Sequence, residues 1–252
     1  MVDEVLCEVK KGIGEVTLNR PESVNSLSRS LMITLRETLN RLDRDESTRV
    51  IILTGSGEKA FCAGIDVKER AMMSQEEVFH SRTLHVMPLF KDIEEMTKPL
   101  IASINGVALG GGAELALACD MRIATDNASF GLREIKWGII PPCGACQRLP
   151  RIVGLGKAKE LIFTGRMIDA KEAEGMGIYN RVVPRGQLHE FTYQLAQEIS
   201  ENSPVAVRQA KKAINVGANL SMALAFDYEA SKECYFMRDL EGSGLKGLKK
   251  SD

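Results

Sequence analysis

The sequence has few aromatic residues and no long uncharged apolar run. Aromatic side chains make up 5% of the 252 residues, and tryptophan occurs once. No segment reaches the roughly 18 uncharged apolar residues that a membrane-spanning helix needs, so we expect no membrane partner. The N-terminal stretch MVDEVLCEVKKGIGEVTLNR has neither an apolar region nor an arginine-rich pattern, which argues against a secretory signal or a transit peptide. These absences predict a soluble, cytoplasmic protein.

An excess of charge of either sign is also missing. The chain carries 33 basic and 34 acidic residues, which gives a formal net charge of −1. Nucleic-acid binding usually requires a clear basic excess, so the balance argues against a nucleic-acid partner. Six cysteines are scattered, and only Cys143 and Cys146 form a C-x-x-C pair. Without a second pair or a nearby histidine cluster this pair predicts no metal site, and we expect reduced thiols.

Hydrophobic periodicity divides the chain into strands, helices and a helical C-terminal part. Strands are predicted at 14–19, 49–54, 100–104 and 121–125, and helices at 27–42, with Ser28 as a possible cap, and at 72–96, interrupted near Pro88. This alternation predicts an α/β core. Further helices are predicted at 188–202, 204–217 and 221–239. We therefore divide the chain into a core at 1–187 and a C-terminal helical region at 188–252. That region is small for an independent core, so it is expected to pack on the main domain or on a neighbouring chain.

The most informative segment is NGVALGGGAELALACD, residues 105–120. Three consecutive glycines, among them Gly111, precede a helix-like apolar stretch with Glu114 in its first turn. Amides at a helix N-terminus have no internal partner and carry partial positive charge, so they can bind a carbonyl oxygen that becomes an oxyanion. Apolar neighbours around Glu114 raise its expected pKa. Oxyanion donors next to a carboxyl group indicate an enzyme. The alternative is a carboxylate that interacts only with the helix dipole.

Two further segments have a similar composition. AFCAGIDVKER, residues 60–70, follows a predicted strand, and its small residues Ala63 and Gly64 allow the Ile65 amide to approach a ligand. ASFGLREIKWGIIP, residues 128–141, places Glu134 between a predicted strand end and an apolar segment. Taken alone, Glu134 is best explained as a solvated or ion-paired carboxylate.

Together these stretches resemble the signatures of the crotonase superfamily, the enoyl-CoA hydratase/isomerase family. The likeness is carried by AFCAGIDVKE, NGVALGGGAELALACD and FGLREIKWGIIP followed by QRLPRIVG, and it extends from NRPESVNSL to FTGRMIDAKEAEGMGIYNRVVP. Three motifs in family order are far more specific than any one of them. The resemblance implies a spiral of ββα units, a C-terminal helical region that forms trimers or dimers of trimers, and an acyl-CoA thioester substrate. It implies no separate cofactor, because coenzyme A is part of the substrate.

The resemblance also implies roles for individual residues. The amides of Ile65 and Gly111 correspond to the oxyanion hole for the thioester oxygen. Glu114 and Glu134 correspond to the two glutamates of the hydratase branch, with Glu114 activating water and Glu134 giving a proton to C2. The positions expected to contact coenzyme A are Ser23, Val24, Ala63, Ile65, Asp66, Lys68, Gly111 and, from a neighbouring chain, a lysine near Lys249.

Several alternatives remain open at this stage. Lys68 is explained equally well as a surface charge. Pro142 stands where glycine is usual and has no N–H, so any water-orienting amide at that position is lost. The predicted reaction is hydration of a 2-enoyl-CoA. A double-bond isomerase, which needs one carboxylate, is the nearest rival, and a thioesterase or a catalytically weak RNA-binding scaffold are further ones. Acyl-chain specificity and the choice between trimer and hexamer cannot be read from the sequence.

Overall fold

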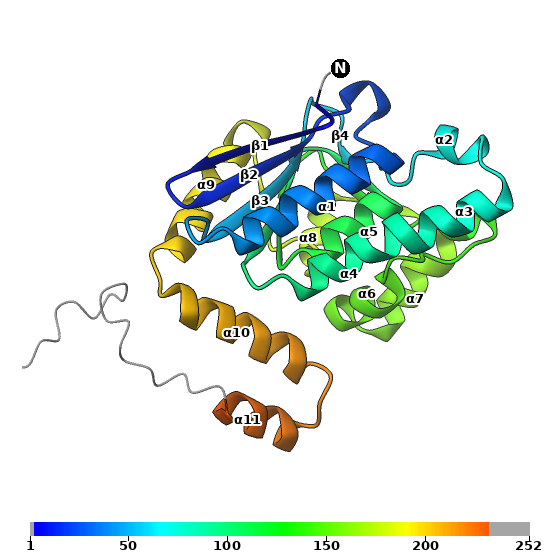
Figure 1. Cartoon of the computed structure of the whole chain (residues 1–252). Coiled ribbons are helices and arrows are strands. Elements are labelled where there is room, and N and C mark those ends of the chain that lie inside the picture. Colours follow the sequence, from blue (N-terminus) through cyan, green and yellow to red (C-terminus); the bar gives the residue numbers. More distant parts are fainter. Residues whose placement is uncertain (1–2, 232–252) are drawn as a thin grey trace, which may run out of the picture.

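Two β-sheets organise the chain in the computed structural model, which describes residues 3–231 (Figure 1). The large sheet has the order β1-β2-β3-β5-β7-β10. Its strands are β1 (Val5–Lys10), β2 (Ile13–Leu18), β3 (Val50–Gly55), β5 (Leu100–Ile104), β7 (Met121–Thr125) and β10 (Arg181–Val183). β1 and β2 form an antiparallel hairpin, and the strands from β2 to β10 are parallel. The four strands predicted from the sequence match β2, β3, β5 and β7 within one residue.

The small sheet has the order β4-β6-β8-β9. Its strands are β4 (Ala60–Cys62), β6 (Val107–Leu109), β8 (Ser129–Gly131) and β9 (Met167–Asp169). β4, β6 and β8 are parallel, and β9 is antiparallel to β8. The strand pairs β3/β4, β5/β6 and β7/β8 each place their first strand in the large sheet and their second in the small one. This alternation confirms the α/β fold with repeated ββα units that the resemblance implied.

Helices make up much of the rest of the described chain, and some of them cover the two faces of the large sheet. They are α1 (Arg29–Arg44), α2 (Val67–Ala71), α3 (Gln75–Ser81), α4 (Met87–Glu95), α5 (Gly111–Ala118), α6 (Ala145–Val153), α7 (Leu155–Thr164), α8 (Ala170–Gly175), α9 (Leu188–Ser200), α10 (Pro204–Gly217) and α11 (Met222–Ser231). As predicted, Ser28 caps α1, and its hydroxyl accepts a hydrogen bond from Leu31 N at 3.1 Å. The break predicted near Pro88 is instead a π-helical turn at Arg82–Val86. Pro88 itself lies in the first turn of α4, where a missing N–H is tolerated.

The core explains why the central strands are almost entirely apolar. On one face of the large sheet, α1 buries Leu31, Leu35, Leu39 and Leu42 in the main hydrophobic cluster. On the other face, α9 packs over Ile52 and its neighbours and forms a second cluster. A parallel sheet buried on both faces requires continuous apolar strands rather than alternating ones.

The last two described helices contact the rest of the chain much less. α10 and α11 have no buried residue, and Figure 1 shows them extending away from the sheets. Lys211 anchors α10 through hydrogen bonds from Nζ to Lys98 O at 2.8 Å and to Asp120 Oδ2 at 2.7 Å. The predicted helix at 204–217 is confirmed, and the one at 221–239 is α11 as far as residue 231. No helix within residues 3–231 is both long and apolar enough to cross a bilayer.

Candidate active site

Two glycine turns bring the amides of Ile65 and Gly111 next to each other. Gly64 has φ +92° and Gly110 has φ +54°, a backbone region that glycine reaches without steric cost. A β-carbon added to Gly111 would lie 3.4 Å from Ile65 N, and one added to Gly64 would lie 3.0 Å from Gly111 N. Within residues 3–231 neither N–H donates a hydrogen bond. Gly111 is also the first residue of α5, where the amides have no partner inside the helix. The site therefore offers two neighbouring donors to a ligand oxygen.

Glu114 lies in the first turn of α5 and is fully buried. Its Oε1 accepts hydrogen bonds from Cys143 N at 2.7 Å and from Ala145 N at 3.2 Å. Its Oε2 has no hydrogen-bond partner among the described residues. Burial raises the pKa of Glu114 to about 7, and the charge of Glu134 adds to this, although the two amides act in the opposite direction. A carboxyl group with this pKa can gain or lose a proton near neutral pH.

Glu134 approaches the same place from η3 (Glu134–Trp137). Its carboxyl group packs against Gly110, because a β-carbon added there would lie 3.1 Å from Glu134 Oε1. Glu134 is 9% exposed, and its Oε2 has no hydrogen-bond partner in the described part of the chain. Burial raises the pKa of this carboxyl group as well. The structure thus brings together all four residues predicted to be catalytic, and each glutamate keeps one unpaired oxygen.

The turn of residues 143–145, which binds Glu114, directly follows Pro142. The two amides bound to Glu114 Oε1 belong to Cys143 and Ala145, which follow Pro142. The missing N–H of Pro142 therefore costs neither of these bonds. These donors could not be predicted from the sequence, because every residue except proline has a main-chain N–H.

The segment containing Ser23 and Val24 lies beside Ala63. Ala63 N donates to Val24 O at 3.1 Å, so these three predicted contact positions lie together. Val24 has φ +53°, which is rare for a β-branched residue and is tolerated only where surrounding contacts hold it. The buried Asn25 supplies such contacts, because its Nδ2 donates to Ser56 O and to Ala60 O, both at 2.9 Å. Asn25 was not singled out in the sequence.

Asp66 and Lys68 occupy different environments. Asp66 caps α2, and its Oδ1 accepts from the amides of Lys68 and Glu69, both at 3.1 Å. Its Oδ2 accepts from Arg20 Nη1 at 2.9 Å. Burial acts to raise the pKa of Asp66, but these hydrogen bonds and the Arg20 charge outweigh it and lower the pKa. Lys68 is exposed. Lys249 lies outside the described residues.

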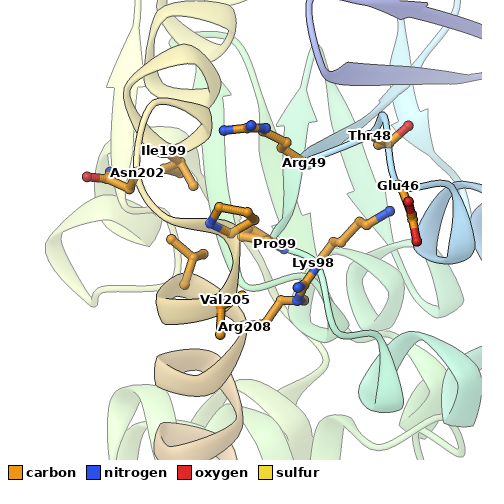
Figure 2. Close-up of a pocket in the computed structure, with 11 residues that line it drawn as sticks. Glu46, Thr48, Arg49, Lys98, Pro99, Ile199, Asn202, Val205 and Arg208 are labelled. Carbon is orange, nitrogen blue, oxygen red and sulfur yellow. The ribbon is translucent and has the colours of Figure 1, made fainter. Parts of the chain in front are cut away.

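A cavity of about 270 Å³ lies elsewhere in the molecule. It lies between the loop that precedes β3 and the junction of α9 with α10, and none of the predicted site residues lines it (Figure 2). Its cationic side chains do not converge in Figure 2. Arg49 donates to Ser200 O at 2.9 Å, and Lys98 donates to Leu42 O at 2.6 Å at the end of α1. These groups hold the fold together, and the cavity shows no arrangement suited to chemistry.

We looked for groups of side chains that could bind a metal ion in the described part of the chain. Within residues 3–231 no group of three or more His, Cys, Asp or Glu side chains is gathered closely enough to bind an ion.

The chain is similar to known proteins in both sequence and structure. The family model for enoyl-CoA hydratase/isomerase matches residues 8–248. The putative enoyl-CoA hydratase/isomerase YngF of Bacillus subtilis is 44% identical over 242 residues, which are 95% of this chain and 93% of that protein. The short-chain-enoyl-CoA hydratase of Clostridium acetobutylicum is 40% identical, over 94% of this chain and 92% of that one. The crystal structure of enoyl-CoA hydratase from Bacillus anthracis superimposes with a TM-score of 0.91 at 43% identity and covers 95% of this chain and 94% of that one.

Proposed function

The chain belongs to the enoyl-CoA hydratase/isomerase family, and from this premise we propose that it adds water across the C2–C3 double bond of a 2-enoyl-CoA thioester. Membership implies an acyl-CoA substrate. The observation that supports hydration is the pair of buried glutamates, each with one oxygen free of hydrogen bonds. Hydration needs one group to take a proton from water and another to deliver a proton to carbon, whereas moving a double bond needs only one carboxylate.

The amides of Ile65 and Gly111 bind the thioester oxygen in this proposal. Attack of water at C3 places negative charge on that oxygen as an enolate forms. Two fixed donors stabilise this charge without reorganising, and removal of one such donor typically costs about 3–4 kcal/mol of transition-state stabilisation. The helix dipole of α5 acts in the same direction at Gly111.

The two glutamates divide the proton transfers. Glu114 acts as the base, because two amide donors to Oε1 favour its ionised form and leave Oε2 free to bind water. Glu134 has no main-chain donor of this kind from another element, and burial raises the pKa of its carboxyl group, which favours the protonated form that gives a proton to C2. The charge of Glu134 raises the pKa of Glu114, so ionisation of both carboxyl groups is disfavoured and the pair shares one proton in this proposal.

In this proposal the coenzyme A part of the substrate lies along the segment where Ala63 is hydrogen-bonded to Val24. Ser23, Val24 and Ala63 form one wall next to Ile65, and Lys68 is exposed nearby in α2. Asp66 supports this wall by capping α2 and binding Arg20. A phosphate contact from Lys249 of a neighbouring chain remains a prediction.

Assembly into trimers or dimers of trimers is supported by the exposed apolar residues of α10 and α11. Ile214, Met222, Leu224 and Phe226 are all more than half exposed in the single chain. Large apolar side chains exposed together on neighbouring helices are typical of an interface between chains. A cytoplasmic location stays a prediction from the sequence.

Product analysis tests the proposed reaction. Purified protein is incubated separately with a 2-enoyl-CoA and a 3-enoyl-CoA, and the products are identified by mass spectrometry. Hydration adds the mass of one water to the 2-enoyl ester. Interconversion of the two esters without a mass change would instead identify an isomerase, and release of free coenzyme A thiol would identify a thioesterase. A panel of linear, branched, cyclic and aromatic enoyl esters then defines the acyl specificity.

We expect the hydration rate to fall as the pH drops below about 7. Burial, together with the Glu134 charge, raises the pKa of Glu114 to about 7, and a protonated Glu114 cannot act as the base. Glu134 must be protonated to act as the acid, so loss of its proton, which burial shifts to higher pH, should also lower the rate. The apparent pKa values of this pH profile describe the pair of glutamates rather than either residue alone. Measuring kcat at saturating substrate across this range tests the expectation, and a kcat independent of pH between about 5 and 9 would contradict it.

A further inference from the structure

A partly buried arginine holds the turn that binds Glu114. Arg148, in α6, donates from Nη1 to Cys143 O at 2.8 Å. Cys143 N in turn donates to Glu114 Oε1 at 2.7 Å, and Ala145 N donates to the same oxygen. The main-chain carbonyl of Cys143 is therefore fixed on one side of the turn while the amides grip the carboxylate on the other.

Arg148 is itself fixed from α4. Its Nε donates to Glu94 Oε2 at 2.9 Å, and Nη2 contacts the same oxygen. The Arg148 side chain is 19% exposed and the Glu94 side chain is 55% exposed, so solvent screens the attraction between them from the Glu94 side. Gly144 gives the guanidinium its space, because it has φ +100° and a β-carbon at this position would overlap Arg148 Nη1. A connected path thus runs from Glu94 through Arg148 and the turn to Glu114.

We propose that Arg148 is a positioning residue for the hydration reaction, which holds the turn of residues 143–145 so that both of its amides bind Glu114 Oε1 and leave Oε2 for water. This inference rests on the proposed function. Arg148 touches neither the substrate nor the reacting atoms in this account. It acts by keeping two donors aligned on the ionised base, and Glu94 acts by keeping Arg148 aligned.

The proposal has a consequence for the pH dependence of the reaction. Amide donors favour the ionised carboxylate, so a looser turn raises the pKa of Glu114. The fall of the rate at low pH, called the acid limb of the pH profile, then moves to higher pH. The other titratable groups that face Glu114 are Glu134 from η3 and the thiols of Cys143 and Cys146. The pKa of both thiols is raised, first by burial and then by the two glutamates, so neither ionises near neutral pH. The charge of Arg82, in the π-helical turn, acts in the opposite direction on the pKa of the Cys143 thiol and lowers it.

Arg148→Lys tests the role of geometry at constant charge. A lysine keeps the positive charge but cannot bind a carboxylate and a carbonyl with one planar fork. We expect kcat to fall about tenfold, as when one charge-assisted hydrogen bond is weakened. The acid limb should move to higher pH, and KM should change less than kcat. Arg151→Lys is the matched control, because Arg151 lies on the same helix and binds Gln147 O and Asn219 Oδ1 instead. Its kcat and pH profile should stay close to those of the wild type.

Glu94→Gln separates positioning from simple electrostatics. Loss of a negative charge by itself would lower the pKa of Glu114 and move the acid limb to lower pH. Loosening of Arg148 predicts the opposite direction. A shift of the limb to higher pH in both Arg148→Lys and Glu94→Gln supports the proposal. An unchanged limb in Arg148→Lys, or a shift to lower pH in Glu94→Gln, overturns it.

A substrate-free measurement keeps this test independent of the proposed reaction. Infrared difference titration of the whole enzyme follows the protonated carboxyl stretch of Glu114, with Glu114→Gln used to assign the band. An upward shift of its titration midpoint in Arg148→Lys supports the positioning role even if the wild type shows no hydration, a result that would remove only the proposed function. If Arg148→Lys does not fold, the same titration of Glu94→Gln decides: an upward shift supports the proposal, and a downward or absent shift overturns it.

Discussion

Glu134→Gln is expected to lower the rate of hydration by about 10²–10⁴-fold, the contribution of a well-placed general acid. Glutamine has the same shape as glutamic acid but cannot give a proton to C2. The carboxyl group lies against Gly110 and its Oε2 is unpaired, so the substitution breaks no hydrogen bond made by that oxygen. Binding of the coenzyme A ester should therefore stay close to normal.

Steady-state kinetics together with calorimetric titration of a saturated acyl-CoA separates these two effects. Glu95→Gln, at an exposed position on α4, is the matched control and should behave like the wild type. Near-normal turnover in Glu134→Gln would remove the proton-donor role of this residue. A parallel loss of turnover and of binding would show that Glu134 holds the fold of the site rather than the reacting proton.

Gly111→Ala is expected to block the oxyanion hole while it leaves the fold intact. The new methyl carbon would lie 3.4 Å from Ile65 N, in the space where the thioester oxygen must approach to about 2.9 Å to form a hydrogen bond. The other nearest atoms lie 3.5 Å and 3.6 Å away, so the methyl group meets ordinary contacts and no overlap. Loss of one oxyanion donor costs about 10²–10³-fold in kcat, and displacement of the oxygen affects both donors.

The matched control for this variant is Gly156→Ala. Gly156 lies in the first turn of α7, and a β-carbon there would meet nothing within 4 Å. Both variants gain helix propensity from alanine, so neither melting temperature should fall far. A Gly111→Ala enzyme with normal kcat/KM would show that the thioester oxygen binds elsewhere.

The parts of the fold that the sequence predicted are those with a repeating or capped pattern. The helix that became α1 has leucines at helical spacing and begins after Ser28, and α10 has the predicted bounds 204–217. The small sheet was not predicted strand by strand, because all four of its strands have only three residues and are too short to show a period. The arrangement of the two sheets came from the resemblance to a family, and from no local pattern.

The site shows the same division. The glycines and small residues of two segments drew attention to Ile65, Gly111 and Glu114, whereas the role expected of Glu134 came from the resemblance to a family. The groups that hold them were missed, since Glu94 and Arg148 are separated by 54 residues and meet only in the folded chain. Pro142 shows how much a sequence observation can leave open. Its missing N–H is certain from the sequence, but only the structure shows that the amides of Cys143 and Ala145 are the ones bound to Glu114.

A crystal structure of Glu134→Gln with a bound 2-enoyl-CoA tests the central claim most directly. The distances to measure join the thioester oxygen to Ile65 N and to Gly111 N. The account predicts that both are about 3 Å, with an ordered water between Glu114 Oε2 and C3 of the acyl chain. A thioester oxygen bound outside these two amides, or an acyl C3 out of reach of any water held by Glu114, would contradict it.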